Sequence, residues 1–444
     1  MTVRRIVIAG FGHAGYAALM SIRRNDPSPE IIIIDPSEYD REYPGRIPCA
    51  IRKILPADCI RSDINLEGLR AERIVASVAQ VIPDSRTVVA VTDSREHRFT
   101  YDSLILCTGQ RQKVPDLHGI ESVLDTGIFR LDRAGAYESI INAASSGGRA
   151  AVIGAGPSGL EMAFALNDLC SSVTVLDSGD RALSRLLDPE LSSIVEKAMS
   201  DLDITFLPGY TVDGISVDTR FTGLTSSGKH LSADFAVLAS GHVPATEAAS
   251  GSGIDYDNCG ISVDDYLSTS VDNIYAAGNC IACPSVIDSR RFRPGRAAAS
   301  HRQGIIAGLN ATGKRSVYRG SAGTFLTRLA DLEISSTGYT TEQALSHGYD
   351  PVSGMARCTV TPECVPDAHE ITLKVVFDRQ TGKILGAQAA GKSGCAERIN
   401  LVSTLIGFDI PVYEAGRIEM GCHPLMSQVN DPLFRAIDFG LKKL

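Results

Sequence analysis

Two glycine-rich stretches with the same spacing could each bind the pyrophosphate of a dinucleotide. They are Gly10-Phe11-Gly12-His13-Ala14-Gly15 and Gly154-Ala155-Gly156-Pro157-Ser158-Gly159. In a G-x-G-x-x-G motif the first glycine permits a tight turn, the second lets backbone N–H groups approach the phosphates, and the third lets helix pack on strand. An acidic residue about 20 positions later suits the ribose hydroxyls. The residues expected to bind the two dinucleotides are Gly10, Gly12, His13, Ala14, Gly15 and Asp35 in the first stretch, and Gly154, Gly156, Gly159 and Asp177 in the second.

Each stretch lies between a predicted strand and a predicted helix, which is the context that the motif needs. The β-branched run Ile6–Ile8 precedes the first stretch, and the run IIIID ends at Asp35. The run AAVI precedes the second, and SVTVLD ends at Asp177. Two dinucleotides held by one chain are typical of hydride transfer between nicotinamide and flavin.

Length and composition limit the remaining classes of protein. The 444 residues are enough for two to four domains, and a net charge of −9 argues against a nucleic-acid footprint. No apolar run approaches the length of a membrane span. Because no export signal is evident, we expect the eleven cysteines in a reducing compartment, and the cytoplasm is the default.

The order of elements along the chain predicts how the two nucleotide folds are joined. Period-two segments from Arg73 to Val91 predict a hairpin, and Thr108-Gly109 ends a strand where the chain could return to the first fold. The stretch DNIYAAGNC (272–280) predicts another buried strand of that fold. After it the chain predicts a separate α+β domain with an antiparallel sheet, two strands of which join at the turn Thr381-Gly382.

The order GFGHAG, TGQ, GAGPSG, AAGNC and a C-terminal α+β domain resembles the FAD/NAD(P)-dependent pyridine nucleotide–disulfide oxidoreductases over essentially the whole chain. The best likeness is to the single-cysteine branch: coenzyme A disulfide reductases, NADH oxidases and peroxidases, and persulfide or polysulfide reductases. The resemblance implies an α/β protein with two Rossmann-like domains in a glutathione-reductase-like arrangement. The implied domains are an FAD domain (1–112 and 242–320), an NAD(P) domain (113–241) and a C-terminal α+β dimerisation domain (321–444) that completes the active site of the partner in a homodimer.

By the same resemblance, Thr108, Gly109 and Asn279 contact the FAD. Asn279 departs from the family, which has an aspartate there that binds the ribityl chain of the flavin. An amide has the same reach, so we expect FAD to bind, with a changed affinity or potential. Glu161 matches a position near the nicotinamide side of the flavin. Asp177 favours NADH by repelling a 2′-phosphate, while Arg181 nearby keeps NADPH as an alternative.

Cys49 is the expected redox cysteine. The segment Pro48-Cys49-Ala50-Ile51 resembles the single-cysteine branch, and Pro44 stands where the Cys-x4-Cys of the dithiol branch has its first cysteine. The dipole at a helix start would stabilise the thiolate, and Arg46, Arg52 or Lys53 could add to this effect. Cys49 would then form a mixed disulfide or persulfide, or cycle through a sulfenic acid. The alternative is a buried structural cysteine.

The segment Gly421–Gln428 resembles the His-Pro-x-x-x-Glu of the dithiol branch, which the neighbouring subunit presents to the cysteine. That match makes His423 an acid/base residue, although Gln428 replaces the glutamate that orients the imidazole. Cys422 could act as a resolving thiol, and a surface histidine at a His-Pro turn is the alternative. Cys280 and Cys283 with Cys358 and Cys364 could bind zinc, but their spacing is irregular, so we expect no metal.

The predicted function is passage of electrons from NADH through FAD to Cys49 and a small disulfide, persulfide or polysulfide, which could be CoA-based. The alternatives are an NADH oxidase or peroxidase, and an electron-transfer subunit that passes NADH electrons to a partner protein.

Overall fold

The computed structural model describes residues 4–92 and 95–444. These residues form two compact units, each of which gathers segments that are distant in the sequence. The first consists of Met1–Pro44, Asp58–Lys113 and His242–Gly323, and the second of Gly45–Ala57, Val114–Gly241 and Thr324–Leu444. Within the expected FAD domain, Met1–Val3, Asp93 and Ser94 lie outside the described residues.

A five-stranded parallel sheet forms the core of the first unit. Its strands run in the order β22, β9, β1, β2, β5, so the strand of the first glycine motif is central. Their bounds are Ile274–Ala276, Ser103–Leu106, Arg5–Ala9, Glu30–Asp35 and Ala71–Val75, respectively. The carboxyl ends of these strands meet at one edge, where ligands of open parallel sheets bind.

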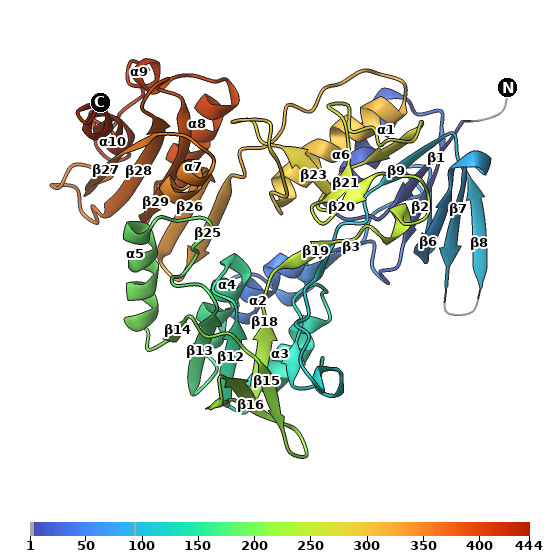
Figure 1. Ribbon diagram of the computed structural model, residues 1–444, viewed down its shortest axis with the longest axis horizontal. Helices are drawn as coiled ribbons and strands as arrows, with labels where there is room; N and C mark the ends of the chain where they lie inside the picture. The colour runs from blue at the N-terminus through green and yellow to red at the C-terminus, as the bar shows by residue number, and fades with distance from the viewer. Residues whose placement is uncertain (1–3, 93–94) are drawn as a thin grey trace. The chain divides into compact units, whose positions relative to one another are not determined.

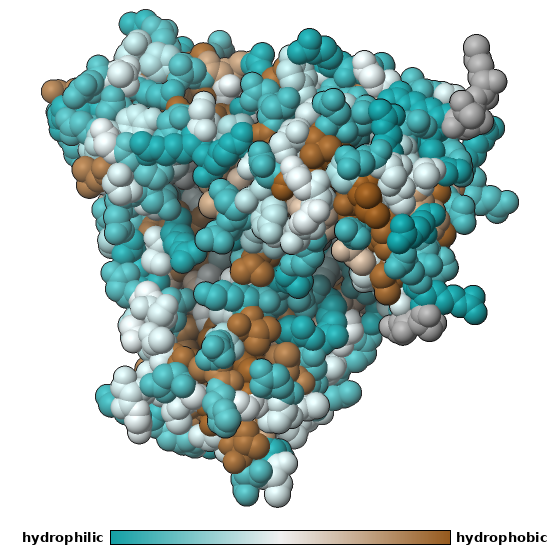
Figure 2. Space-filling view, turned by 45° about the vertical axis from the view of Figure 1, so that its right-hand side comes forward, coloured by the Kyte–Doolittle hydropathy of each residue, from teal (hydrophilic) through white to brown (hydrophobic). Residues whose placement is uncertain are grey.

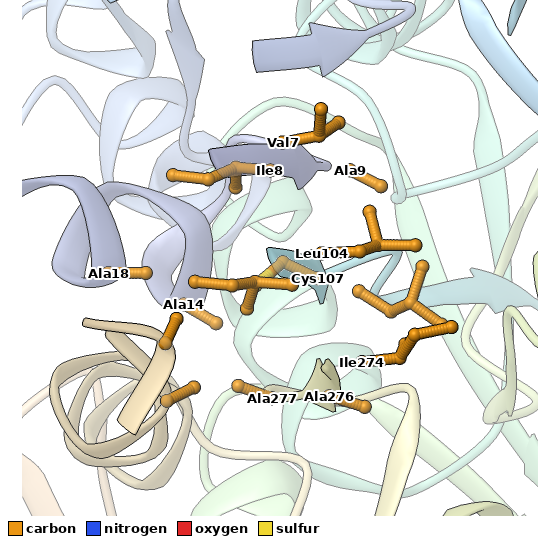
Figure 3. Close-up of a cluster of buried hydrophobic side chains, with 14 of the residues drawn as sticks. Val7, Ile8, Ala9, Ala14, Ala18, Leu104, Cys107, Ile274, Ala276 and Ala277 are labelled. Atoms are coloured by element: carbon orange, nitrogen blue, oxygen red, sulfur yellow. The ribbon is translucent and has the colours of Figure 1, made fainter. Parts of the chain in front are cut away.

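Helices α1 (His13–Asn25) and α6 (Ala297–Ala311) pack together on this sheet (Figure 1). Small residues permit the close approach, since a Cβ on Gly304 would collide with the carbonyl oxygen of Ala14. Figure 3 shows the side chain of Ile8 on the face of the sheet toward the helices, and that of Leu104 on the opposite face.

The antiparallel hairpin predicted from Arg73 to Val91 begins later than expected. Residues 71–75 form β5, an edge strand of the parallel sheet, because they pair with β2. The hairpin itself consists of β6 (Ser77–Ile82) and β7 (Thr87–Val91), and β8 (Glu96–Thr100) extends it. The short strands that complete this unit are β3 (Arg41–Glu42), β4 (Arg61–Ser62), β10 (Gln110–Gln112), β19 (His242–Pro244), β20 (Tyr256–Asp257), β21 (Gly260–Ser262), β23 (Ile281–Pro284) and β24 (Arg291–Phe292).

The second unit contains another five-stranded parallel sheet, in the order β11, β18, β12, β13, β14. Their bounds are Ile128–Phe129, Phe235–Leu238, Arg149–Ile153, Ser172–Asp177 and Thr205–Pro208. The accompanying elements are α3 (Ala136–Ala144), α4 (Pro157–Leu166), α5 (Pro189–Ser200), β15 (Gly214–Val217), β16 (Phe221–Ser226) and β17 (Lys229–Ser232). The short helix α2 (Ile47–Ile51), expected in the FAD domain, groups with this unit because it packs on α3 and α4.

The C-terminal part of the second unit is an antiparallel sheet in the order β25, β26, β29, β28, β27. Its strands are Phe325–Leu329, Leu332–Gly338, Ile384–Gly391, Glu370–Asp378 and Pro351–Thr359, and its helices are α7 (Thr341–Ser346), α8 (Cys395–Gly407), α9 (Val412–Ala415) and α10 (Pro432–Leu441). The turn predicted at Thr381-Gly382 joins β28 to β29. The predicted fold, two parallel nucleotide-binding sheets and a C-terminal antiparallel domain, is confirmed.

The face drawn in Figure 2 is mainly hydrophilic, with separate small patches of hydrophobic residues. Of the helices in residues 4–92 and 95–444, none combines the length and apolar character needed to cross a membrane.

Candidate active site

The first glycine motif forms an open turn at the carboxyl end of β1. Gly10 has φ of +99°, and a Cβ there would collide with the carbonyl oxygen of Cys107. A Cβ on Gly15 would collide with the carbonyl oxygen of Gly10, so strand and helix are in contact through glycine. A Cβ on Gly12 would meet nothing within 4 Å, and Gly12 is the N-cap of α1, where no side chain caps the helix. His13 and Ala14 form the first helical turn, whose N–H groups suit a phosphate.

Asp35 closes this turn from the end of β2. One carboxylate oxygen accepts the backbone N–H of Phe11 at 2.6 Å, and the other accepts the N–H of Ser37 at 2.9 Å. A carboxylate has further lone pairs, so ribose hydroxyls can still donate to Asp35. The turn and its acid therefore fit the pyrophosphate and ribose of a dinucleotide.

The second motif is built in the same way. Gly154 has φ of +118°, a Cβ on Gly159 would collide with the carbonyl oxygen of Gly154, and the space above Gly156 is open to at least 4 Å. Gly156 is the N-cap of helix α4, where no side chain caps the helix. The carboxylate of Asp177 accepts the N–H groups of Ala155 at 2.6 Å and of Gly179 at 2.7 Å. The second unit thus contains a separate site that fits a dinucleotide.

Thr108, Gly109 and Asn279 all lie at the carboxyl edge of the first sheet. The Thr108 hydroxyl donates to the carbonyl of Ala245 at 2.6 Å, and the Ala245 N–H donates to the carbonyl of Gly109 at 3.0 Å, which fixes the returning chain. Asn279 Oδ1 accepts the Ser300 hydroxyl at 3.1 Å. A Cβ on the adjacent Gly278 would lie 3.1 Å from the Cβ of Ala14, so Asn279 stands beside the start of α1. This placement fits contact with a dinucleotide at the first motif.

Cys49 lies in the single turn of α2 and is partly exposed. Its surroundings raise the pKa of the thiol, mainly through burial and then through the charge of Glu161, while Arg52 acts in the opposite direction. The prediction that neighbouring residues stabilise the thiolate is therefore wrong, because burial and Glu161 together raise the pKa of Cys49. Arg52 contributes as expected but is outweighed, and its Nε also lies 3.8 Å from a carboxylate oxygen of Asp168.

Glu161 connects two elements around this cysteine. It lies on α4, which packs against both α2 and β25, and its Oε1 accepts the Thr327 hydroxyl at 2.5 Å. The sequence placed Glu161 near the nicotinamide side of the flavin and did not indicate Thr327. Nothing near Thr327 in the sequence signals this contact, because 166 positions separate the two residues.

His423 and Cys422 are exposed in the segment between α9 and α10. The Nδ1 of His423 accepts the N–H of Leu425 at 3.3 Å. Gln428, which stands in place of an orienting glutamate, donates to the Thr359 hydroxyl at 2.6 Å and accepts from Arg435 at 2.7 Å. Gln428 thus fixes the segment to the end of β27. The roles expected for His423 and Cys422 need a second subunit and stay predictions.

Cys280 and Cys283 are fully buried in the first unit. Burial raises the pKa of Cys283 to about 12, although a hydrogen bond with Tyr318 lowers it. Cys358 and Cys364 belong to the second unit. Within residues 4–92 and 95–444, no group of three or more His, Cys, Asp or Glu residues is arranged to hold a metal ion.

Comparison with known proteins agrees with this architecture. The sequence model described as "Pyridine nucleotide-disulphide oxidoreductase" matches residues 4–304, and the model of its dimerisation domain matches residues 326–432. An NADH oxidase of Methanocaldococcus jannaschii is 29% identical over 453 residues, covering 99% of both chains. An NAD(P)H coenzyme A polysulfide/persulfide reductase of Pyrococcus horikoshii is 28% identical over 439 residues, covering 97% of each. The solved NAD-dependent persulfide reductase from A. fulgidus superposes with a TM-score of 0.93 at 27% identity, covering 99% of this chain and 83% of that one.

Proposed function

The chain belongs to the pyridine nucleotide-disulphide oxidoreductase family, and from that premise we propose that it reduces a small disulfide, persulfide or polysulfide at Cys49 with electrons from NADH. At the coarser level it is an NAD(P)H-dependent flavin oxidoreductase, in keeping with the two dinucleotide sites. The observation that carries the finer proposal is the single, partly exposed Cys49 on α2, with Glu161 and Arg52 as its charged neighbours.

The two glycine turns and their carboxylates would position the cofactors. FAD, when bound there, would supply a group that can accept hydride from the nicotinamide and pass two electrons to sulfur. Asp35 holds its turn through the Phe11 N–H, and Asp177 does the same through the Ala155 N–H, so both phosphate sites are preorganised. Preorganised backbone N–H groups bind phosphate without a cost of rearrangement.

The sulfur chemistry follows from a lone reactive thiol. The Cys49 thiolate attacks the outer sulfur of a persulfide, so that a new S–S bond forms at Cys49 and the S–S bond of the substrate breaks, which releases the substrate thiol once it takes up a proton. Two electrons and two protons then convert the Cys49 persulfide into the Cys49 thiol and hydrogen sulfide. With a disulfide the same steps give a mixed disulfide and two molecules of thiol.

The choice of substrate rests on the relatives. The P. horikoshii protein is named for coenzyme A polysulfide and persulfide, which supports a CoA-based sulfur substrate here. The M. jannaschii protein is named an NADH oxidase, so an oxidase or peroxidase reaction at Cys49 is the second candidate. A cytoplasmic, reducing location would keep Cys49 reduced between turnovers, and it stays a prediction.

The C-terminal domain supports a homodimer. Leu425, Met426 and Val429 expose 67%, 74% and 87% of their surface, within the segment that carries His423. Hydrophobic side chains exposed to this extent on neighbouring positions are typical of protein interfaces. We propose that a second copy covers them, and that His423 of the opposite subunit supplies the proton for the leaving thiol.

An anaerobic NADH titration tests the role of Cys49. The FAD-loaded protein is first oxidised with a small polysulfide, and the excess is removed. Two equivalents of NADH per flavin are expected, one for the flavin and one for the sulfur on Cys49. Cys49→Ser should consume one. If the wild-type protein also consumes one, the proposal fails, and transfer of electrons to a partner protein becomes the better explanation.

A further inference from the structure

The helix that begins at the second nucleotide site also approaches the reactive cysteine. Helix α4 packs against α2, which carries Cys49, and against β25 of the C-terminal domain. Glu161 lies on this helix and accepts the Thr327 hydroxyl of β25 at 2.5 Å. Because this bond is short and part-buried, it restrains the position of the carboxylate.

Charged or titratable groups lie on each of the helices around Cys49. Its own helix is preceded by Arg46 and followed by Arg52 and Lys53, helix α4 contributes Glu161, and helix α3, which also packs on α2, carries Tyr137 and Glu138. Of these groups, Glu161 raises the pKa of Cys49 and Arg52 lowers it, after the larger effect of burial. Among the described residues, the carboxylate that acts on the thiol is thus the one that Thr327 holds.

We propose that Thr327 is a positioning residue whose hydroxyl holds the Glu161 carboxylate beside Cys49, so that the cysteine rests as a thiol until a bound sulfur substrate engages it. The proposal rests on the role given above to Cys49. A thiol reacts slowly with peroxide, since the thiolate is the nucleophile. A sulfur substrate bound beside α2 stays long enough to react when Cys49 is briefly deprotonated, whereas a peroxide that diffuses past does not. The pair therefore favours sulfur substrates over peroxide.

The rate of alkylation of Cys49 as a function of pH tests this arrangement. The reduced, FAD-loaded protein is treated with iodoacetamide between pH 6 and pH 10, and mass spectrometry follows the Cys49 peptide. Glu161→Gln should increase the rate at pH 7 severalfold, because removing the negative charge lowers the pKa of Cys49 and so raises the fraction of thiolate. Thr327→Val should give a smaller increase, because the carboxylate is still present but no longer held. Thr327→Ser keeps the hydroxyl, so its alkylation rate should depend on pH as in the wild-type protein.

Thr341 offers a matched control in the same unit. Its hydroxyl donates to the carboxylate of Asp188 at 2.7 Å, which is the same kind of bond away from Cys49. Thr341→Val should leave the Cys49 profile unchanged, so a change there would show general loosening and overturn the proposal. The proposal would also be overturned if the alkylation rate of Cys49 in Thr327→Val depended on pH as in the wild type. A Thr327→Ser variant whose alkylation rates differ from the wild type would overturn it as well.

The alkylation profile is independent of turnover, so the two proposals fail separately. If Thr327→Val leaves the alkylation rate of Cys49 unchanged while the protein still consumes two NADH equivalents, only the positioning role of Thr327 is refuted. One NADH equivalent, with the profile shifted as expected, refutes the redox role of Cys49 and leaves the electrostatic effect of the pair standing. If Glu161→Gln fails to fold, the comparison of valine with serine at position 327 decides the question.

Discussion

Replacing Asp177 by asparagine should change which nicotinamide nucleotide the protein uses. The Asp177 carboxylate lies at the end of β13 and holds its turn through the N–H groups of Ala155 and Gly179. A 2′-phosphate at the ribose would bring a second anion to this position. Arg181, the nearby cation that could bind such a phosphate, is instead paired with Asp180 at 2.9 Å and with Glu342 at 2.8 Å. We therefore expect NADH to be the preferred nucleotide.

The size of the effect follows from two terms. Two unit charges 4 Å apart repel by about 1 kcal/mol in water and by about 4 kcal/mol at the effective dielectric near a protein surface. Asp177 is partly exposed, so we take about 1–2 kcal/mol for the repulsion. A ribose hydroxyl bonded to a carboxylate adds about 1.5 kcal/mol in favour of NADH. If both terms are lost, Asp177→Asn lowers the preference for NADH over NADPH by about 50- to 400-fold. If the asparagine amide keeps the hydrogen bond to the ribose, only the repulsion is lost and the preference falls by about tenfold.

The ratio of kcat/KM for the two nucleotides is the quantity to measure, with ferricyanide as acceptor so that no sulfur substrate is needed. Asparagine has one side-chain oxygen for the two N–H groups that Asp177 binds, so the turn will loosen, but this damage affects both nucleotides alike and cancels in the ratio. Glu342→Gln, which releases Arg181 from one partner, should raise kcat/KM for NADPH by about 2- to 5-fold, as expected for an exposed ion pair. An unchanged ratio in Asp177→Asn would refute this explanation of nucleotide preference.

Four further outcomes are expected. Lys374→Met should lower the free energy of unfolding by about 3–5 kcal/mol in urea, because it leaves the buried Asp188 carboxylate, 2.9 Å from the Lys374 ammonium, without its cation. Burial alone would raise the pKa of Asp188, but hydrogen bonds from Lys374 and Thr341 lower it overall. The stability that this carboxylate gives is therefore complete above its ordinary pKa and is lost as the pH falls through the pKa of the folded state. Urea unfolding of the wild-type protein at a series of pH values should show this loss below about pH 4. Asn279→Asp should make the flavin harder to reduce in a spectroelectrochemical titration, since a negative charge at this position opposes added electrons, and an unchanged potential would place Asn279 away from the flavin. Met426→Glu should shift sedimentation toward a monomer, and a stable dimer in that variant would show that the interface lies elsewhere.

The two glycine turns could be predicted from sequence because their signals are local. The glycines of each motif, the strand before them and the acid at the end of the next strand lie within about 30 residues, and the turn geometry follows from the missing Cβ atoms. The fold of the C-terminal domain was predictable for a related reason, since strand alternation and the turn at Thr381-Gly382 are also local.

The direction of the pKa shift of Cys49 could not be predicted from the local sequence. The sequence places Arg52 and Lys53 next to Cys49, which suggests a stabilised thiolate, whereas packing of α2 on α4 buries the thiol and brings Glu161 to it. Gln428 is a similar case. Its position in the segment suggests a weakened partner for His423, yet the structure uses its amide to bind Thr359.

Helix α4 joins these local and distant features. Gly159 can pack so closely on the turn only because it lacks a Cβ, which would otherwise collide with the carbonyl oxygen of Gly154. This contact sets the depth and register of the helix, and Glu161 follows two residues later. The glycine that shapes the nucleotide site therefore also sets where the Glu161 carboxylate stands relative to Cys49 and Thr327. A substitution at Gly159 that spared nucleotide binding would still displace Glu161 and change the reactivity of the cysteine.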